Sequence, residues 1–148
     1  MYRCIDLALE AKRAGNTPVG SLVVIEEKLI AEAQEEVPVS PDRFAHAELL
    51  AVKQASKQLG RKTFPEATLY TTAEPCFLCS YAIRETRIGL VVIGTRTPHV
   101  GGASSQYPLL SASDIVPWGE PPTIIWGVLH DECSALRSRV PKQTGSQV

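Results

Sequence analysis

Apolar positions recur along the chain with two periods, one near 3.6 residues and one near 2, and segments of the two kinds alternate. Residues 2–14 and 45–59 carry apolar side chains near helical spacing, and a glycine follows each segment. Residues 88–94, IGLVVIG, are apolar at most positions, as expected for a strand covered on both faces. The pattern predicts helices over 2–14, 45–59, 76–86 and 131–140, and strands over 19–25, 28–33, 67–71, 88–94 and 122–129.

The order of these elements predicts the fold class. Strand–helix–strand units imply parallel strands with right-handed crossovers, whereas the first two strands are close enough to form a hairpin. We therefore predict an α/β protein, a three-layer α/β/α sandwich with a mixed five-stranded sheet. Residues 1–140 should form one domain, and residues 141–148, PKQTGSQV, a disordered tail. The long segment 95–121 should be irregular, with a short helix near 104–111.

Composition narrows the class of protein without indicating a chemistry. The 148 residues are 44% hydrophobic and 21% charged with a net charge of −1, which is ordinary for a globular domain. This balance predicts no broad basic face, so any nucleic-acid contact would need a local patch. No apolar run reaches the ~18 residues of a membrane span. We expect a cytoplasmic protein without a membrane partner, whose four cysteines are reduced.

Two cysteines three residues apart lie at the start of a predicted helix. Cys76 and Cys79, in PCFLC, share one face of its first turn, where unpaired backbone N–H groups and the helix dipole favour thiolates. Pro75 is expected within this first turn, where proline is favoured. In a reducing compartment such a pair indicates a metal or redox site more often than a disulfide. Two thiolates can hold a metal ion, but they need one or two further ligands.

A histidine and a carboxylate open the predicted helix 45–59. His46 and Glu48, in AHAELLAV, can both reach a pocket beyond an open first turn. One histidine and two cysteines leave the fourth tetrahedral position of zinc open for water, as in catalytic sites. The order His-x-Glu … Pro-Cys-x-x-Cys is the signature of zinc-dependent deaminases. A structural zinc knuckle and a solvated carboxylate are the competing interpretations, and the two motifs together disfavour both.

The chain also resembles the cytidine and deoxycytidylate deaminase superfamily from Tyr2 to about Leu136. The blocks that carry the resemblance are TPVGSLVV, HAELLAV, ATLYTTAEPCFLCSYAI, RIGLVVIGTRT and GVLHDECSAL. They are most similar to the branch that holds bacterial tRNA adenosine deaminase, guanine deaminase and fungal cytosine deaminase. The resemblance implies a hydrolase of C–N bonds in cyclic amidines that releases ammonia from an exocyclic amine. It also implies a homodimer.

Site roles follow from the same resemblance. It implies one catalytic Zn²⁺ per chain, held by His46, Cys76 and Cys79, which activates a water molecule. Glu48 is then the catalytic residue that carries protons from this water to the substrate. The backbone groups of Ala47 and Cys76 are expected to orient the substrate and the water.

The substrate pocket departs from the family at one position. Related deaminases usually carry asparagine eleven residues before the zinc histidine, where this chain has Glu35, followed by Glu36. An ionised carboxylate only accepts hydrogen bonds, so we expect one of the two to contact N–H donors of a guanine-, cytosine- or aminotriazine-like ring. Phe44 and His99 are further candidate pocket residues, the latter because it follows the carboxyl end of a strand.

Three functions stay open at this point. We expect a deaminase of a free nucleobase or related amino-heterocycle, and no nucleic-acid partner. The net charge is −1, and the segment after DECSAL, RSRVPKQTGSQV, contains two arginines and no aromatic residue. The alternative is a tRNA-specific adenosine deaminase that forms inosine, which needs basic and aromatic groups around the pocket. The third is a non-catalytic zinc scaffold, which would be marked by loss of Glu48.

Overall fold

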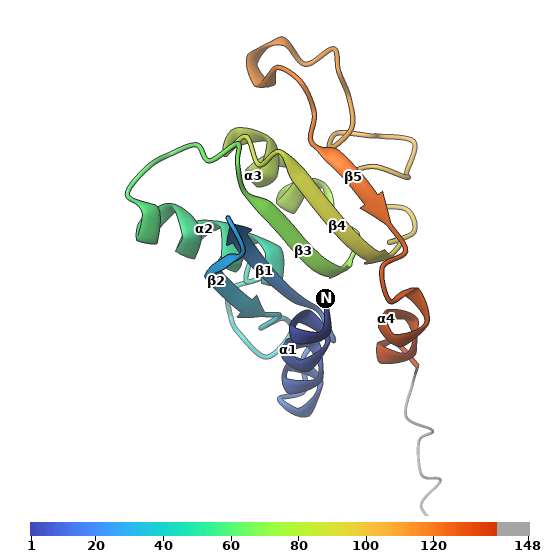
Figure 1. The fold of residues 1–148 in the computed structure, drawn as a ribbon. Coiled ribbons are helices and arrows are strands. Elements are labelled where there is room, and N and C mark those ends of the chain that lie inside the picture. The colour runs from blue at the N-terminus through green and yellow to red at the C-terminus, as the bar shows by residue number, and fades with distance from the viewer. Residues whose placement is uncertain (139–148) are drawn as a thin grey trace, which may run out of the picture.

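The computed structural model describes residues 1–138, which form one five-stranded sheet with helices on both faces (Figure 1). The helices are α1 (Tyr2–Arg13), α2 (Ala47–Leu59), α3 (Phe77–Glu85) and α4 (His130–Leu136), with a short 3₁₀ helix η1 (Val116–Trp118). The strands are β1 (Gly20–Ile25), β2 (Lys28–Gln34), β3 (Thr68–Ala73), β4 (Leu90–Thr95) and β5 (Thr123–Trp126). The predicted domain end at residue 140 and the predicted tail 141–148 lie outside the described residues.

The sheet has the order β2-β1-β3-β4-β5. Strand β1 pairs antiparallel with β2 and β3, whereas β3, β4 and β5 are mutually parallel. Helices α2 and α3 cover one face, and α1 and α4 cover the other (Figure 1). This arrangement confirms the predicted three-layer sandwich with a mixed sheet.

The hydrophobic core is built on the neighbouring strands β3 and β4. Leu69 of β3 and Val91 and Ile93 of β4 are fully buried, and Ile83 of α3 packs against the same cluster. Helix α1 approaches β1 so closely that a Cβ at Gly20 would lie 2.0 Å from the Cys4 carbonyl oxygen. Glycine is therefore required at the start of β1.

One edge of the sheet collects the segments that carry the sequence motifs. Strands β3 and β4 both end there, and α3 starts soon after β3. Gln34, the last residue of β2, pairs with Gly20 at the same edge, so the loop that leads to α2 also leaves from it. The antiparallel hairpin and the parallel unit thus bring the starts of α2 and α3 together.

The segment after β4 differs from its prediction. The helix expected near 104–111 does not form, and the short helix η1 lies later, at Val116–Trp118. A buried cation holds this segment in its irregular path: the Arg84 guanidinium, on a residue 1% exposed, donates to the carbonyl oxygens of Leu109, Leu110, Ala112 and Gly119. These hydrogen bonds fix the segment 109–119 against α3.

Two helix starts also differ from their predictions. Cys76 is the residue that caps α3, so Pro75 lies just before the helix and not in its first turn. Helix α4 begins at His130, one residue before its predicted start, and follows Leu129 in a left-handed conformation. None of the helices in residues 1–138 has the length and apolar composition needed to span a bilayer.

Candidate metal centre

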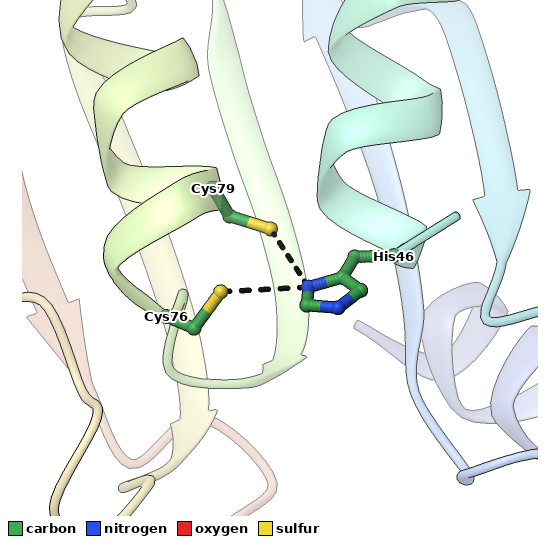
Figure 2. A group of neighbouring side chains, drawn as sticks. All are labelled: His46, Cys76 and Cys79. Atoms are coloured by element: carbon green, nitrogen blue, oxygen red, sulfur yellow. Dashed lines mark hydrogen bonds between the residues drawn. The ribbon is translucent and has the colours of Figure 1, made fainter. Parts of the chain in front are cut away.

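The first turns of α2 and α3 point their side chains at one another. His46 is the N-cap of α2 and Cys76 is the N-cap of α3, while Cys79 lies one turn further along α3. Figure 2 shows the imidazole ring of His46 between the two helices, with one ring nitrogen turned toward both sulfur atoms. Among the described residues, these three side chains form the one group of at least three potential metal ligands.

The distances within this group fit a tetrahedral zinc ion. His46 Nδ1 lies 3.4 Å from Cys76 Sγ and 3.6 Å from Cys79 Sγ, and all three ligand atoms lie within 4.8 Å of one another. Zinc bonds of about 2.3 Å to sulfur and about 2.1 Å to nitrogen, at a tetrahedral angle, separate the two ligand atoms by about 3.6 Å. Three protein ligands leave one position of the tetrahedron for water. The residues therefore fit a catalytic zinc site.

The two thiols have opposite pKa shifts. The hydrogen bond between them lowers the pKa of Cys76 to about 5 and raises that of Cys79 well above its ordinary value. Burial alone would lower the pKa of His46, but the negative charges of Glu35 and Cys76 raise it. A metal-free site thus holds a thiolate at Cys76 beside a protonated Cys79, and zinc binding must release the second thiol proton.

Glu48 lies behind the ligands as a buried carboxyl group. Its residue is 4% exposed; Oε1 lies 3.2 Å from Thr71 Oγ1 and Oε2 lies 3.7 Å from Cys79 Sγ. Burial raises the pKa of Glu48 to about 7. Near neutral pH such a group can both accept and donate a proton, which is the property required of a general acid and base.

The structure separates the two candidate substrate carboxylates. Glu35 is buried, and its Oε2 accepts a hydrogen bond of 2.8 Å from the backbone N–H of Ala47, next to His46. Burial raises the pKa of Glu35. Glu36 instead lines a cavity with Arg3 and Leu50, between α1 and α2 beside strand β2. Glu35 is thus the carboxylate at the metal centre, and Glu36 faces away from it.

Two other predicted pocket residues lie in loops near the centre. Phe44 precedes α2, and its side chain is exposed. His99 has a positive φ of 69° and lines a cavity of about 400 Å³ with Gln106 and Tyr107. The loop that carries His99 reaches the centre at Gly101, which forms an isolated bridge with Cys76.

A carboxylate that was not among the predicted site residues holds this loop. Glu74, 2% exposed, accepts hydrogen bonds from the backbone N–H groups of Thr97, Ala103 and Ser104, at 2.9, 3.0 and 2.7 Å. The Ser104 hydroxyl donates to it as well, at 2.6 Å. The signal in the sequence was its place in AEPC, two residues before a zinc ligand and directly after a strand. Glu74 fixes the loop 97–104 against the turn that carries Cys76.

Comparisons with known proteins agree with this geometry. Residues 1–95 match the family model for the cytidine and deoxycytidylate deaminase zinc-binding region. A tRNA-specific adenosine deaminase of Bacillus subtilis is 33% identical over 138 residues, which cover 93% of this chain and 84% of that protein. One from Aquifex aeolicus is 40% identical over 104 residues, covering 68% and 69%. A structure from studies of A-to-I editing by tRNA:A34 deaminases superposes with a TM-score of 0.82 at 27% identity, covering 90% of this chain and 94% of the other.

These relatives correct two predictions made from the sequence. The preference for a free nucleobase or amino-heterocycle as substrate is wrong, and so is the expectation of no nucleic-acid partner, because the relatives at 32–40% identity are tRNA deaminases. The net charge was a poor guide to nucleic-acid binding, because it sums all charges of the chain and does not indicate where basic residues cluster. The fold, the ligand geometry and the family match agree on the class of protein. The chain belongs to the cytidine and deoxycytidylate deaminase family and is a zinc-dependent hydrolytic deaminase.

Proposed function

We propose that this protein hydrolyses the exocyclic C–N bond of an adenosine in tRNA, giving inosine and ammonia. The observation that carries the proposal is the similarity to the Bacillus subtilis tRNA-specific adenosine deaminase, which extends over 93% of this chain. The assembled site supports it, since the ligand group and a buried carboxyl group stand at the same sheet edge. The scaffold interpretation loses its support because Glu48 is present and lies beside the ligands.

The residues of the site have different roles in the proposed reaction. His46, Cys76 and Cys79 would hold zinc, which when bound supplies a water molecule acidified to a pKa of ~7. Glu48 accepts one proton from the water at a carboxylate oxygen and passes it to the adenine ring nitrogen, and then takes the proton of the added hydroxyl group and passes it to the departing amine. Thr71, 3.2 Å from Glu48 Oε1, holds the carboxyl group in place for both transfers. Water adds and ammonia leaves, so the atoms balance.

Glu35 is the residue we assign to substrate contact beside the metal. One of its oxygens accepts the Ala47 N–H, which leaves the other for a substrate donor. Adenosine offers N–H donors on its amine and O–H donors on its ribose, and a carboxylate can accept from either. Phe44, an exposed aromatic residue in the loop before α2, is suited to stack on an unpaired base. His99 lines a separate cavity with Gln106 and Tyr107, in the loop whose Gly101 pairs with Cys76.

A second copy of the chain is the partner we propose for the apolar groove between α2 and α3. This groove, of about 300 Å³, is lined by Leu49, Val52, Leu78 and Tyr81 among others, and the last two are 36% and 52% exposed. Sedimentation of the zinc-loaded protein should give a dimer mass. A cytoplasmic location stays a prediction.

The decisive experiment is inosine formation in RNA. Zinc-loaded protein is incubated with an anticodon stem-loop carrying adenosine at the wobble position, and inosine and ammonia are quantified. We expect one ammonia per inosine, and no product from a Glu48→Ala variant that retains zinc. Absence of inosine in every stem-loop tested, with zinc bound stoichiometrically, would overturn the proposal.

A further inference from the structure

A second cavity lies on the α4 side of the sheet, where β4 and β5 end. Its volume is about 330 Å³. The residues that line it are Arg96, Trp126, His130, Ser134 and Arg137, together with Gly94, Thr95 and Gly127. His130 and Ser134 of α4 and Arg137, its C-cap, follow one another at intervals of four and three, so they share one face at the cavity. The cavity thus brings together two guanidinium groups and an aromatic ring from segments about 40 residues apart.

Both guanidinium groups are held in place. Arg96 stacks over the Trp126 ring, with its guanidinium carbon 4.5 Å from the ring centroid. Arg137 donates from Nη1 to the Arg96 carbonyl at 3.1 Å and from Nη2 to Thr97 Oγ1 at 3.2 Å. A guanidinium group has five N–H donors, so each arginine keeps donors that these contacts do not use.

Neither arginine has a carboxylate partner within residues 1–138. Ion pairs in this part of the chain join Arg3 to Glu10 and Glu32, and Arg61 to Glu66. Of the two acidic residues on α4, Asp131 contacts His130 and not an arginine, and Glu132 forms no ion pair within residues 1–138. Two fixed guanidinium groups without a carboxylate favour an anion, and phosphate oxygens match their planar donor geometry.

The arginine pair is tied to the metal centre through the buried carboxylate of Glu74. Thr97, which Arg137 contacts, donates its N–H to Glu74 Oε2 and its hydroxyl to the Glu74 carbonyl, both at 2.9 Å. Glu74 lies two residues before Cys76. The short segment from Arg96 to Thr97 therefore connects the cavity to the turn that carries a metal ligand.

We propose that this cavity binds a backbone phosphate of the RNA close to the nucleoside that is deaminated. Arg96 and Arg137 contact the phosphate oxygens, and Trp126 holds Arg96 in position. The inference rests on the proposed function and assigns a place on the protein to the polyanionic part of that substrate. A local pair of arginines also explains how a chain with a net charge of −1 can bind RNA.

The test measures binding and salt dependence separately from catalysis. Binding of a fluorescein-labelled anticodon stem-loop to zinc-loaded protein is followed by anisotropy at several salt concentrations, for wild type, Arg96→Gln, Arg137→Gln and the double variant. Lys28→Gln is the matched control, because it also removes one positive charge. Lys28 is the first residue of β2 and lies at the end of that strand away from the metal centre. Arg96→Lys and Arg137→Lys keep the charge, and melting temperatures verify that each variant folds.

We expect each arginine-to-glutamine change to weaken RNA binding roughly tenfold at low salt and to reduce the slope of log K against log salt by about 1. The value of kcat/KM on the RNA should fall together with the affinity, and Lys28→Gln should match wild type. A methylphosphonate at one backbone position near the target should weaken binding to wild type but not to the double variant. That position identifies the bound phosphate.

The outcomes separate this inference from the proposed function. RNA that is converted to inosine with unchanged affinity and salt slope in the double variant overturns the phosphate site and leaves the function standing. RNA that binds through the two arginines without forming inosine overturns the function and leaves the site standing. Displacement of RNA by inorganic phosphate, without any effect of methylphosphonates, identifies a site for free anions and overturns the assignment to RNA.

Discussion

The Oε2 atom of Glu48 lies 3.7 Å from the Sγ atom of Cys79, although 31 residues separate them in the sequence. One group comes from the first turn of α2 and the other from the first turn of α3. The contact places a buried carboxyl group directly behind a metal ligand.

Glu48→Gln should abolish turnover while the zinc site persists. The amide has nearly the same shape but cannot take up and return a proton, so we expect kcat to fall by roughly 10²- to 10⁴-fold. Zinc content, measured by atomic absorption, should stay at one ion per chain. Glu36→Gln is the matched control and should retain wild-type kcat, because Glu36 lines the cavity between α1 and α2. Equal activity of the two variants would remove Glu48 from the mechanism.

The zinc-free protein should contain one thiol that reacts at mildly acidic pH. The pKa of Cys76, about 5, lies below the ordinary value of 9, so its thiolate persists at neutral pH and is lost as the pH falls through about 5. Alkylation by iodoacetamide, mapped by mass spectrometry, should follow this midpoint. Buried Cys4, with a pKa raised to about 12, is the internal control and should stay unmodified. Zinc should protect Cys76. A reaction that begins only above pH 8 would contradict the low pKa.

Glu35→Gln should reduce kcat/KM on RNA by about tenfold or more, because an amide N–H would face a substrate donor and leave it unpaired. The amide oxygen can still accept the Ala47 N–H, so the melting temperature and zinc content should change little. Steady-state kinetics on the stem-loop substrate measure the effect, with Glu36→Gln as the paired variant. A kcat/KM equal to that of wild type would show that Glu35 has no part in substrate recognition.

Glu74→Gln should destabilise the protein by about 2 to 3 kcal/mol, because one amide oxygen cannot replace a carboxylate that accepts four hydrogen bonds. Urea unfolding of the zinc-free protein measures this cost. Zinc affinity should fall in parallel, since the loop pairs with Cys76 at Gly101. Glu66→Gln, which breaks only an exposed ion pair with Arg61, should leave the free energy of unfolding nearly unchanged. Similar costs for the two variants would contradict the role of Glu74.

The sequence alone determined the secondary structure, the sheet and the ligand set. Helix and strand periodicity depends on neighbours within a few residues, so the four main helices and five strands could be located to within a few residues at their ends. His46, Glu48, Cys76 and Cys79 were also accessible, because each motif sits at a helix start and helix starts are local features. Helices and strands in this order can pack in only a few layer arrangements with right-handed crossovers, so the three-layer sandwich could be predicted as well.

Only the tertiary structure decided which side chains face the metal and which charges gather. Glu35 and Glu36 are adjacent in sequence, yet only the first reaches Ala47, since successive residues at the end of a strand point to opposite sides. The irregular segment after β4 depends on Glu74 and Arg84, which contact it from more than 20 residues away. Arg96 and Arg137 are 41 residues apart in the sequence but in contact in the structure, and the net charge of the chain does not indicate this contact. Local sequence patterns determine the helices and strands, whereas long-range hydrogen bonds and burial determine which side chains surround the site.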